Sequence, residues 1–440
     1  MWFAIAIGIP AALLWFLGMT PAHKIAVLCF LCTFQVFISS GLPNLTIIVS
    51  LLIVIEFGMR TVPRLSLVLY ILALVSLTSA LWSSSPGGAY VNALYFFTAG
   101  GLIAAGHFLR MTQRENFDRT IIFPFLAAGS VLAALVVLFR IFPAWEINFF
   151  RSPIAKVFIN PSVVDGLFAG APNNALADDK AGAFFVNANV ASVYLGVVLL
   201  LSAYMATRYL TKSLYVVSTL AGVGVISTGS KTGLGILIIV VLLLVLRWAR
   251  GRLVALILAI IVPVGFFFAS IQLVEQLQEA EFSTTSRLFL WQNAVSAILE
   301  SPLLGLGYGG WEARMSAVFS AVGSANNYPP HNMFLAYWVY SGVATVVLLV
   351  VAIFLTFRIL VRGPRPAFYA VLAFGWTVLH AMGDNTGYLV DWHVMPVMAL
   401  FIGFSHSTGS TLDLALTRPT ATGAAGGYVP PTWPRLVHRE

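Results

Sequence analysis

Long runs of apolar residues, separated by turn residues and charges, recur along most of the chain. A helix of about 20 apolar residues crosses the hydrocarbon core of a bilayer, so these runs predict membrane-spanning helices. The short runs on either side of residues 41–44 are the weakest of the candidates, and we therefore expect 12 to 13 spans. The candidates lie near residues 2–19, 25–40, 44–58, 66–82, 90–109, 121–142, 183–206, 214–228, 233–247, 253–270, 333–356, 367–383 and 392–405.

Composition agrees with this pattern and excludes other classes of protein. Of the 440 residues 59% are hydrophobic and 9% are charged, whereas a soluble domain averages about 25% charged residues. The net charge of +8 comes from basic residues scattered among apolar runs, so we expect no nucleic-acid partner. Cys29 and Cys32 lie one turn apart in an apolar run, which favours buried packing. We predict an all-α, polytopic integral membrane protein.

Every second loop between the predicted spans is rich in Lys and Arg, and this alternation indicates the orientation of the chain in the membrane. Loops rich in these residues stay on the cytoplasmic side. The long connections 143–182 and 271–332 then face the opposite side, which in a bacterium is the periplasm of the inner membrane. We expect residues 1–405 to form one membrane domain, starting with a retained span, and residues 406–440, rich in Thr, Gly, Ala and Pro, to form a cytoplasmic tail without fixed structure.

The second long connection contains a helical pattern. Leu288, Trp291, Val295 and Ile298 recur at helical spacing, and Ser301-Pro302 ends the pattern. We predict a short amphipathic helix that lies on the membrane surface or caps the bundle.

A polar break, Ser227-Thr-Gly-Ser-Lys231-Thr-Gly233, separates two short apolar runs. Irregular backbone at membrane depth is tolerated where it is packed in protein or lines a watery cavity. The Lys231 ammonium, with hydroxyls and backbone N–H groups beside it, suits an anion such as the diphosphate of a lipid-linked substrate. The alternative is an ordinary turn with a lysine that reaches toward water.

Arg287 lies at the start of the predicted amphipathic helix, after Ser283-Thr-Thr-Ser286. The start of a helix favours negative charge, and a guanidinium adds a two-pronged donor for phosphate. The alternative is a solvated arginine or a partner for Glu279 or Glu281.

His331 follows two prolines directly before the span that starts at Met333. The prolines restrict the backbone here, and an imidazole can act as a general base. The alternative is a structural histidine at the membrane interface. A last group of polar residues flanks the final external turn and comprises His380, Asp384, Asp391 and His393. These residues could form an ion path, although helix capping and mutual pairing are commoner roles for such residues.

The segment 305–310 fits the pattern G-x-G-x-x-G, but no strand precedes it, so a dinucleotide site is not indicated. Its glycines are better explained by a sharp turn of the backbone. The sequence contains no P-loop, no H-E-x-x-H and no paired Asp-x-Asp. The lack of an external Asp-x-Asp weakens a metal-dependent glycosyl transfer without excluding a metal-free one.

Three separated segments together resemble the signature region of the O-antigen ligase and polymerase superfamily. They are Arg287-x3-Trp291, Ser301-Pro-Leu-Leu-Gly-Leu-Gly-Tyr-Gly-Gly310 and His331-Asn-Met-Phe-Leu335, with Gly342 further along. The polar break at 227–233 is similar to the small external loop of that family. The resemblance covers about residues 220–360, and the amino-terminal half is similar in the layout of its spans.

The resemblance implies a membrane glycosyltransferase that takes its glycan from an undecaprenyl-diphosphate carrier and acts on the periplasmic face. It implies that Arg287 and Lys231 bind the diphosphate, where the family usually has arginine in place of Lys231, and that His331 lies at the reaction centre. Ser230, Arg314 and Asn332 are expected to support them. The activated donor needs neither metal nor cofactor, and the transfer is expected to invert the anomeric carbon.

Three functions remain open at this stage. A ligase would transfer the glycan to a lipid A core or similar acceptor, and a polymerase would join repeat units of an O-antigen or exopolysaccharide on the carrier. We favour the ligase on the compact layout of the signature loop. A transporter or flippase is a different class, which predicts internal repeats and charges near the middle of the membrane. The concentration of polar chemistry on one face favours an enzyme with membrane lipids around it.

Overall fold

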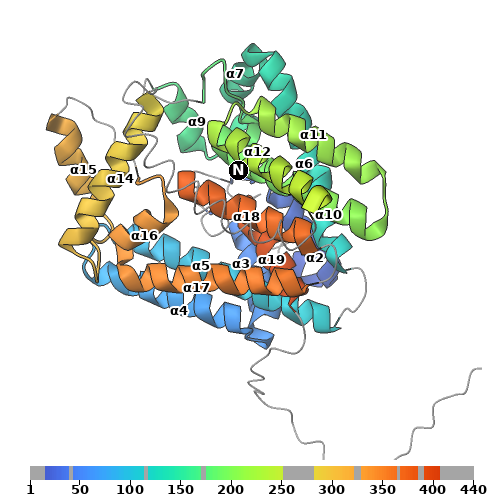
Figure 1. Cartoon of the computed structure of the whole chain (residues 1–440), viewed down its shortest axis with the longest axis horizontal. Helices are drawn as coiled ribbons and strands as arrows, with labels where there is room; N and C mark the ends of the chain where they lie inside the picture. Colours follow the sequence, from blue (N-terminus) through green and yellow to red (C-terminus); the bar gives the residue numbers. More distant parts are fainter. Residues whose placement is uncertain are drawn as a thin grey trace, which may run out of the picture.

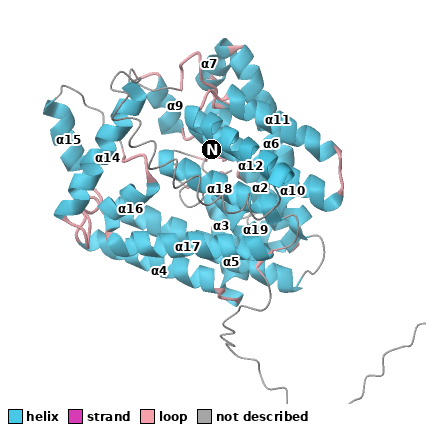
Figure 2. Cartoon of the chain, viewed as in Figure 1, coloured by secondary structure: helices cyan, strands magenta, loops and turns pink. Residues whose placement is uncertain are grey.

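The computed structural model describes residues 15–38, 43–112, 117–169, 175–250, 282–321, 329–363, 367–384 and 391–406. In these ranges the regular structure is helical, and no strand is present (Figure 2). The predicted all-α membrane fold is therefore confirmed. Most of the candidate span 2–19, all of 253–270 and the tail beyond His406 lie outside the described residues.

Six of the described helices contain stretches long and apolar enough to cross a membrane, and four shorter helices are also apolar. The long ones are α4 (Arg64–Thr78, continued by η2, Ser79–Leu81), α5 (Gly87–Thr112), α6 (Phe117–Ile141), α10 (Ala188–Tyr209), α12 (Lys231–Arg250) and α17 (Val343–Arg362). The shorter ones are α2 (Pro21–Leu31), α11 (Ser213–Ser227), α18 (Ala367–Gly383) and α19 (Met395–Ser405). Helix α3 (Leu45–Phe57) and the turn η1 (Gly58–Arg60) connect α2 to α4.

Close helix packing through glycine builds the centre of the bundle, where α5 lies against α4 and α19 (Figure 1). A Cβ atom at Gly106 would lie 2.2 Å from the Leu400 carbonyl oxygen, and one at Gly403 would lie 2.0 Å from that of Ile103. Small residues let membrane helices approach this closely, where dispersion contacts replace a hydrophobic driving force.

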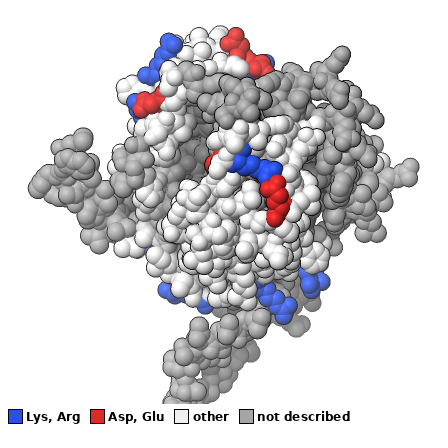
Figure 3. Space-filling view, turned by 90° about the vertical axis from the view of Figure 1, so that its left-hand side faces the viewer, with Lys and Arg blue, Asp and Glu red and all other residues white. Residues whose placement is uncertain are grey.

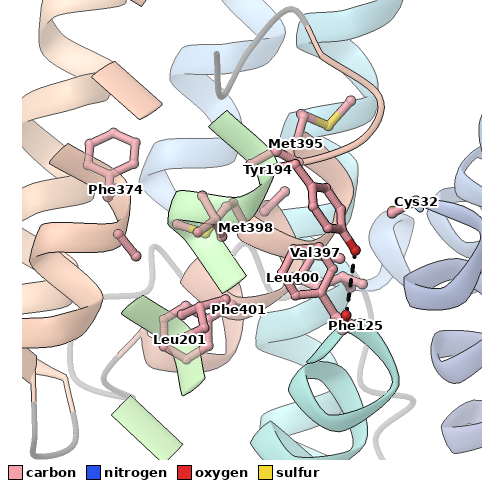
Figure 4. Packing of buried hydrophobic residues seen from close by; sticks show 14 of the residues in the cluster. Cys32, Phe125, Tyr194, Leu201, Phe374, Met395, Val397, Met398, Leu400 and Phe401 are labelled. Atoms are coloured by element: carbon pink, nitrogen blue, oxygen red, sulfur yellow. Dashed lines mark hydrogen bonds between the residues drawn. The ribbon is translucent and has the colours of Figure 1, made fainter. Parts of the chain in front are cut away.

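The largest buried cluster joins aromatic and aliphatic side chains of several helices (Figure 4). Tyr194 donates a hydrogen bond to the Phe125 carbonyl oxygen over 3.5 Å and also bonds the Thr33 hydroxyl. Cys29 and Cys32 are free thiols in this cluster, so the predicted packing role is confirmed.

The predicted span 333–356 is wrong as a single helix. It is divided into α16 (Met333–Ser341) and α17 at Gly342, which has a φ of +80°. A Cβ atom at Gly342 would lie 1.9 Å from the Leu303 carbonyl oxygen, and Leu306 N donates to the Val339 carbonyl oxygen over 2.6 Å. The glycine is needed because another backbone segment crosses the helix at this point.

Both long connections contain helices. The first forms α7 (Pro143–Arg151), α8 (Ala155–Phe158) and α9 (Pro161–Leu167), and ends in the turn η3 (Ala183–Phe185); the second forms α14 (Phe282–Glu300) and α15 (Gly310–Ala321). In Figure 1 α14 and α15 stand at the left-hand end of the bundle. Figure 3 faces that end, where most of the described surface is uncharged.

The amphipathic helix predicted before Ser301-Pro302 is α14, but its buried face differs from the prediction. Leu290, Ala294, Ala297 and Ile298 pack against α15 and α16, while Val295 is 47% exposed. The helix thus has two apolar stripes, the predicted one with Val295 and a second one with Ala294. Trp311 and Met315 of α15 cover the second stripe. Because α14 begins at Phe282, Arg287 lies in its second turn and not at its start.

An ion pair between a buried lysine and a half-buried glutamate joins α2 to α3. Lys24 is 2% exposed, and its Nζ atom lies 2.7 Å from both carboxylate oxygens of Glu56. The rings of Phe16 and Phe57 lie within 5.8 Å of the same ammonium. Such a pair is costly to break because the remaining charge stays buried without its partner.

We expect Glu56→Gln to destabilise the protein by about 3 kcal/mol, since it leaves the buried Lys24 charge without a carboxylate. Thermal unfolding of the detergent-solubilised protein measures this loss. Asp165→Asn is the matched control, because it breaks the exposed ion pair with Lys156 and should cost less than about 1 kcal/mol. Equal losses for the two variants would contradict the role of Glu56 as the partner of the buried Lys24 charge.

Candidate functional site

The polar turn between α11 and α12 is held by the end of the first long connection. Gly229 has a φ of +69°, and a Cβ atom there would lie 1.9 Å from the Asp179 carbonyl oxygen. Lys180 Nζ donates to the Gly229 carbonyl oxygen over 2.5 Å, and Ala181 N donates to that of Thr228 over 3.1 Å. Lys231 is exposed and is the first residue of α12. The tight turn therefore presents the lysine at the start of a helix.

Ser230 is buried and ties this turn to α10. Its hydroxyl accepts a hydrogen bond from Gly233 N over 3.1 Å, which satisfies a free N–H group in the first turn of α12. The same hydroxyl donates to Asn189 Oδ1 over 2.6 Å. Ser230 therefore belongs to the hydrogen-bond network that holds this turn, and its support of the reaction stays a prediction.

His331 and Asp384 form the polar contact at the centre of the site. The His331 Nδ1 atom lies 3.0 Å from Asp384 Oδ1, and Asp384 Oδ2 accepts a hydrogen bond from Asn189 Nδ2 over 2.6 Å. An ionised carboxylate can only accept hydrogen bonds, so the proton of the neutral imidazole lies on Nδ1. The lone pair of the ring is then on Nε2, where a base needs it.

The backbone at His331 has a φ of +50°, which is uncommon for a residue with a side chain. The adjacent Asn332 holds this conformation. Asn332 is fully buried, accepts hydrogen bonds from Phe334 N and Leu335 N at the start of α16, and donates to the Met382 carbonyl oxygen over 3.0 Å. Asn332 therefore connects the backbone beside His331 to the end of α18.

Arg287 joins the polar turn from α14. Its Nη1 atom donates to Thr232 Oγ1 over 3.2 Å, next to Lys231. Thr232 also lies close to Gly383, where a Cβ atom would come within 3.2 Å of Thr232 Cγ2. Gly383 directly precedes Asp384, so the structure brings Arg287 and the polar turn to the same region as the His331 pair.

Arg314 does not share these contacts. It forms an ion pair with Glu300 over 2.7 Å and donates to Ser296 Oγ over 3.0 Å. The guanidinium lowers the pKa of the Glu300 carboxyl. In the structure Arg314 fastens α15 to α14, although the sequence analysis expected it to support the site.

The other members of the polar group at the ends of α18 and α19 have different hydrogen-bond partners. Asp391 accepts hydrogen bonds from the backbone and ring nitrogens of His393 over 2.9 and 2.7 Å, which confirms the mutual pairing expected of them. The His380 ring lies 3.5 Å from the Ser192 hydroxyl. Within the described residues, Asp384 is the member of this group whose hydrogen bond reaches His331.

The sequence did not indicate that Asp384 contacts His331, nor that Asn189 and Lys180 belong to the site. Asp384 stood out as a charge at the end of a span, but its partner lies 53 residues away in the sequence. Nothing in the sequence indicated that Asn189 contacts the site, because an asparagine at the start of a helix is usually explained as a helix cap. Within the described residues no group of three metal-ligating side chains could hold an ion.

Residues 214–350 match the family model described as O-antigen ligase. These residues are similar to the O-antigen ligases, and we refer to residues 214–350 as the O-antigen ligase segment. It contains Lys231, Arg287 and His331, so the superfamily that the motifs indicated is confirmed. A search of curated proteins found no match to the chain. Asn189 and Asp384 lie outside the O-antigen ligase segment, on either side of it, and the fold brings them to its histidine.

We expect Asn332→Ala to lower the stability of the O-antigen ligase segment by about 2 kcal/mol, because it removes a helix cap and a buried hydrogen bond. The measurement is thermal unfolding in detergent. Asn293→Ala is the control, since Asn293 donates to the Phe289 carbonyl oxygen on an exposed face. If both variants unfolded at the same temperature, Asn332 would not hold the start of α16.

Proposed function

We propose that the protein transfers a glycan from an undecaprenyl-diphosphate carrier to a hydroxyl of an acceptor such as a lipid A core, on the periplasmic face of the inner membrane. The family match supports a glycosyltransferase of the ligase or polymerase type. The observation that carries the proposal is the contact of His331 with Asp384, in the region where Arg287 meets the polar turn.

Arg287 and Lys231 are the groups that would bind the diphosphate. Arg287 reaches Thr232 with one guanidinium nitrogen, so it is already directed toward the start of α12. The first turn of a helix adds partial positive charge and backbone donors. The Lys231 ammonium contributes charge without the two-pronged geometry of arginine. Together these groups stabilise the negative charge that grows on the diphosphate as it leaves.

His331 is the base in this mechanism, and Asp384 is its positioning residue. Asp384 fixes the proton on Nδ1 and stabilises the imidazolium that forms when Nε2 takes up a proton. The acceptor hydroxyl loses its proton to Nε2 and its oxygen bonds to the anomeric carbon. The bond from that carbon to the diphosphate oxygen breaks, and the carrier diphosphate leaves. Attack opposite the leaving group inverts the anomeric carbon.

The acceptor distinguishes a ligase from a polymerase, because both enzymes use the same kind of donor. We favour a ligase on the layout of the signature loop, in which Arg314 ties α15 to α14, and Trp311 and Met315 join one buried cluster with residues of α14.

We expect His331→Ala and Arg287→Gln each to lower the rate of glycan transfer at least about a hundredfold, because one removes the base and the other a charge on the leaving group. Asp384→Asn should lower the rate less, since the imidazole remains. The assay uses purified protein in detergent with a defined lipid-linked donor and a core acceptor.

Arg151→Gln is the matched control for Arg287→Gln, because Arg151 is an exposed arginine of α7 that stacks on Phe168. It should transfer glycan at the rate of the unchanged protein. Full activity of His331→Ala or Arg287→Gln would refute the assignment of these residues.

Deletion of the gene separates the ligase from the polymerase. For a ligase we expect all attached glycan to disappear while lipid-linked chains accumulate, because the chains are made but not transferred. Gel analysis of extracted glycolipids measures this. If single repeat units remained attached and long chains were lost, the protein would be a polymerase.

A further inference from the structure

A cavity opens between α4 and α17 at the end of α17 that is far from α16. It is lined by Arg64, Arg358, Arg362 and His406, together with apolar side chains of α17, and has a free volume of about 60 Å³. The three guanidinium groups of the lining suit a compact anionic group. His331 lies just before α16, so the cavity at the far end of α17 is separate from the site at His331.

Three arginines share this cavity. Arg358 and Arg362 lie one turn apart on α17 and so point to the same side of the helix. Arg64 faces them from α4, which packs against α17. None of the three is paired with a carboxylate within the described residues. Like charges gathered in this way repel one another unless an anion lies between them.

The start of α4 adds a second source of positive potential. Arg64 is its first residue, and Pro63 before it has no side chain that could cap the free N–H groups. A cation at a helix start opposes the helix dipole, whereas an anion there is favoured. A bound anion would satisfy both the backbone donors of α4 and the arginines.

Exposed apolar stripes lead from the cavity along both helices. Each stripe is in helical register with an arginine of the cavity. Leu67, Ile71 and Leu74 follow Arg64 on α4 and are 42%, 42% and 60% exposed; Val347, Val350 and Phe354 precede Arg358 on α17 and are 56%, 51% and 63% exposed. Paired apolar surfaces that end in positive charge fit acyl chains joined to an anionic head.

The position of the cavity agrees with a lipid ligand. Helix α17 has 20 residues and so is about 30 Å long, close to the thickness of the hydrocarbon core. Its last turn therefore lies at the level of the lipid phosphates. Basic pockets between membrane helices can bind anionic head groups. We propose that this cavity binds the phosphate of an anionic phospholipid, held by Arg64, Arg358 and Arg362.

Native mass spectrometry of the full-length protein, freed of lipid in a nonionic detergent, tests the proposal. Dioleoylphosphatidylglycerol should bind at least about tenfold more tightly than dioleoylphosphatidylcholine, because a zwitterionic head gains less from the arginines. Arg358→Gln should weaken the binding of phosphatidylglycerol at least about tenfold, while Arg358→Lys, which keeps the charge, should weaken it less. Arg362→Gln gives the same test if Arg358→Gln does not fold.

Lys212→Gln is the matched control, because Lys212 is an exposed cation of the loop between α10 and α11 and does not line the cavity. It should leave the affinity for phosphatidylglycerol unchanged. Equal affinity for the two lipids, or equal weakening by Lys212→Gln and Arg358→Gln, would overturn the proposal. Displacement of phosphatidylglycerol by inorganic phosphate at an equal concentration would also overturn it, since the cavity would then take a free anion.

Discussion

A carboxylate buried at the end of a membrane helix has to be surrounded by donors, and Asp384 meets this constraint through contacts with distant segments. Asp384 is 5% exposed, and a buried charge without partners is costly. His331 and Asn189 supply the donors, and Asn189 in turn accepts a bond from Ser230 in the polar turn. The beginning of α10, the turn before α12, the approach to α16 and the end of α18 are thereby held in one network.

Glycine makes this arrangement sterically feasible. Gly229 and Gly342 both have a positive φ. The backbone of Asp179 passes close to Gly229, and the backbone of Leu303 passes close to Gly342. Each contact leaves no room for a Cβ atom. The two long connections are thus packed onto the membrane helices through backbone contacts, and the residues that they carry acquire fixed positions.

The sequence was sufficient for the fold class and for the superfamily, because hydrophobic runs and short motifs are local signals. It was insufficient for the break at Gly342, since a glycine within an apolar run is compatible with a continuous helix. The buried face of α14 was assigned to the wrong stripe because the residues that cover it, Trp311 and Met315, belong to another helix. Asp384 was visible as a charge, but its contact with His331 depends on the packing of α18 beside the start of α16.

Arg287 and the arginines of the cavity at the end of α17 have different surroundings. Near His331, the described hydrogen bond of Arg287 goes to the neutral hydroxyl of Thr232. A hydrogen bond to a charged partner contributes about 1.5–3 kcal/mol, compared with about 0.5–1.5 kcal/mol for a neutral one. Under the proposed mechanism a diphosphate therefore gains by replacing the hydroxyl, while Thr232 keeps the guanidinium directed toward the site beforehand. At the far end of α17, Arg64, Arg358 and Arg362 line a cavity together. Under the proposed lipid binding, an anionic phosphate there would reduce the repulsion among the three guanidinium groups, which favours a lipid that stays bound.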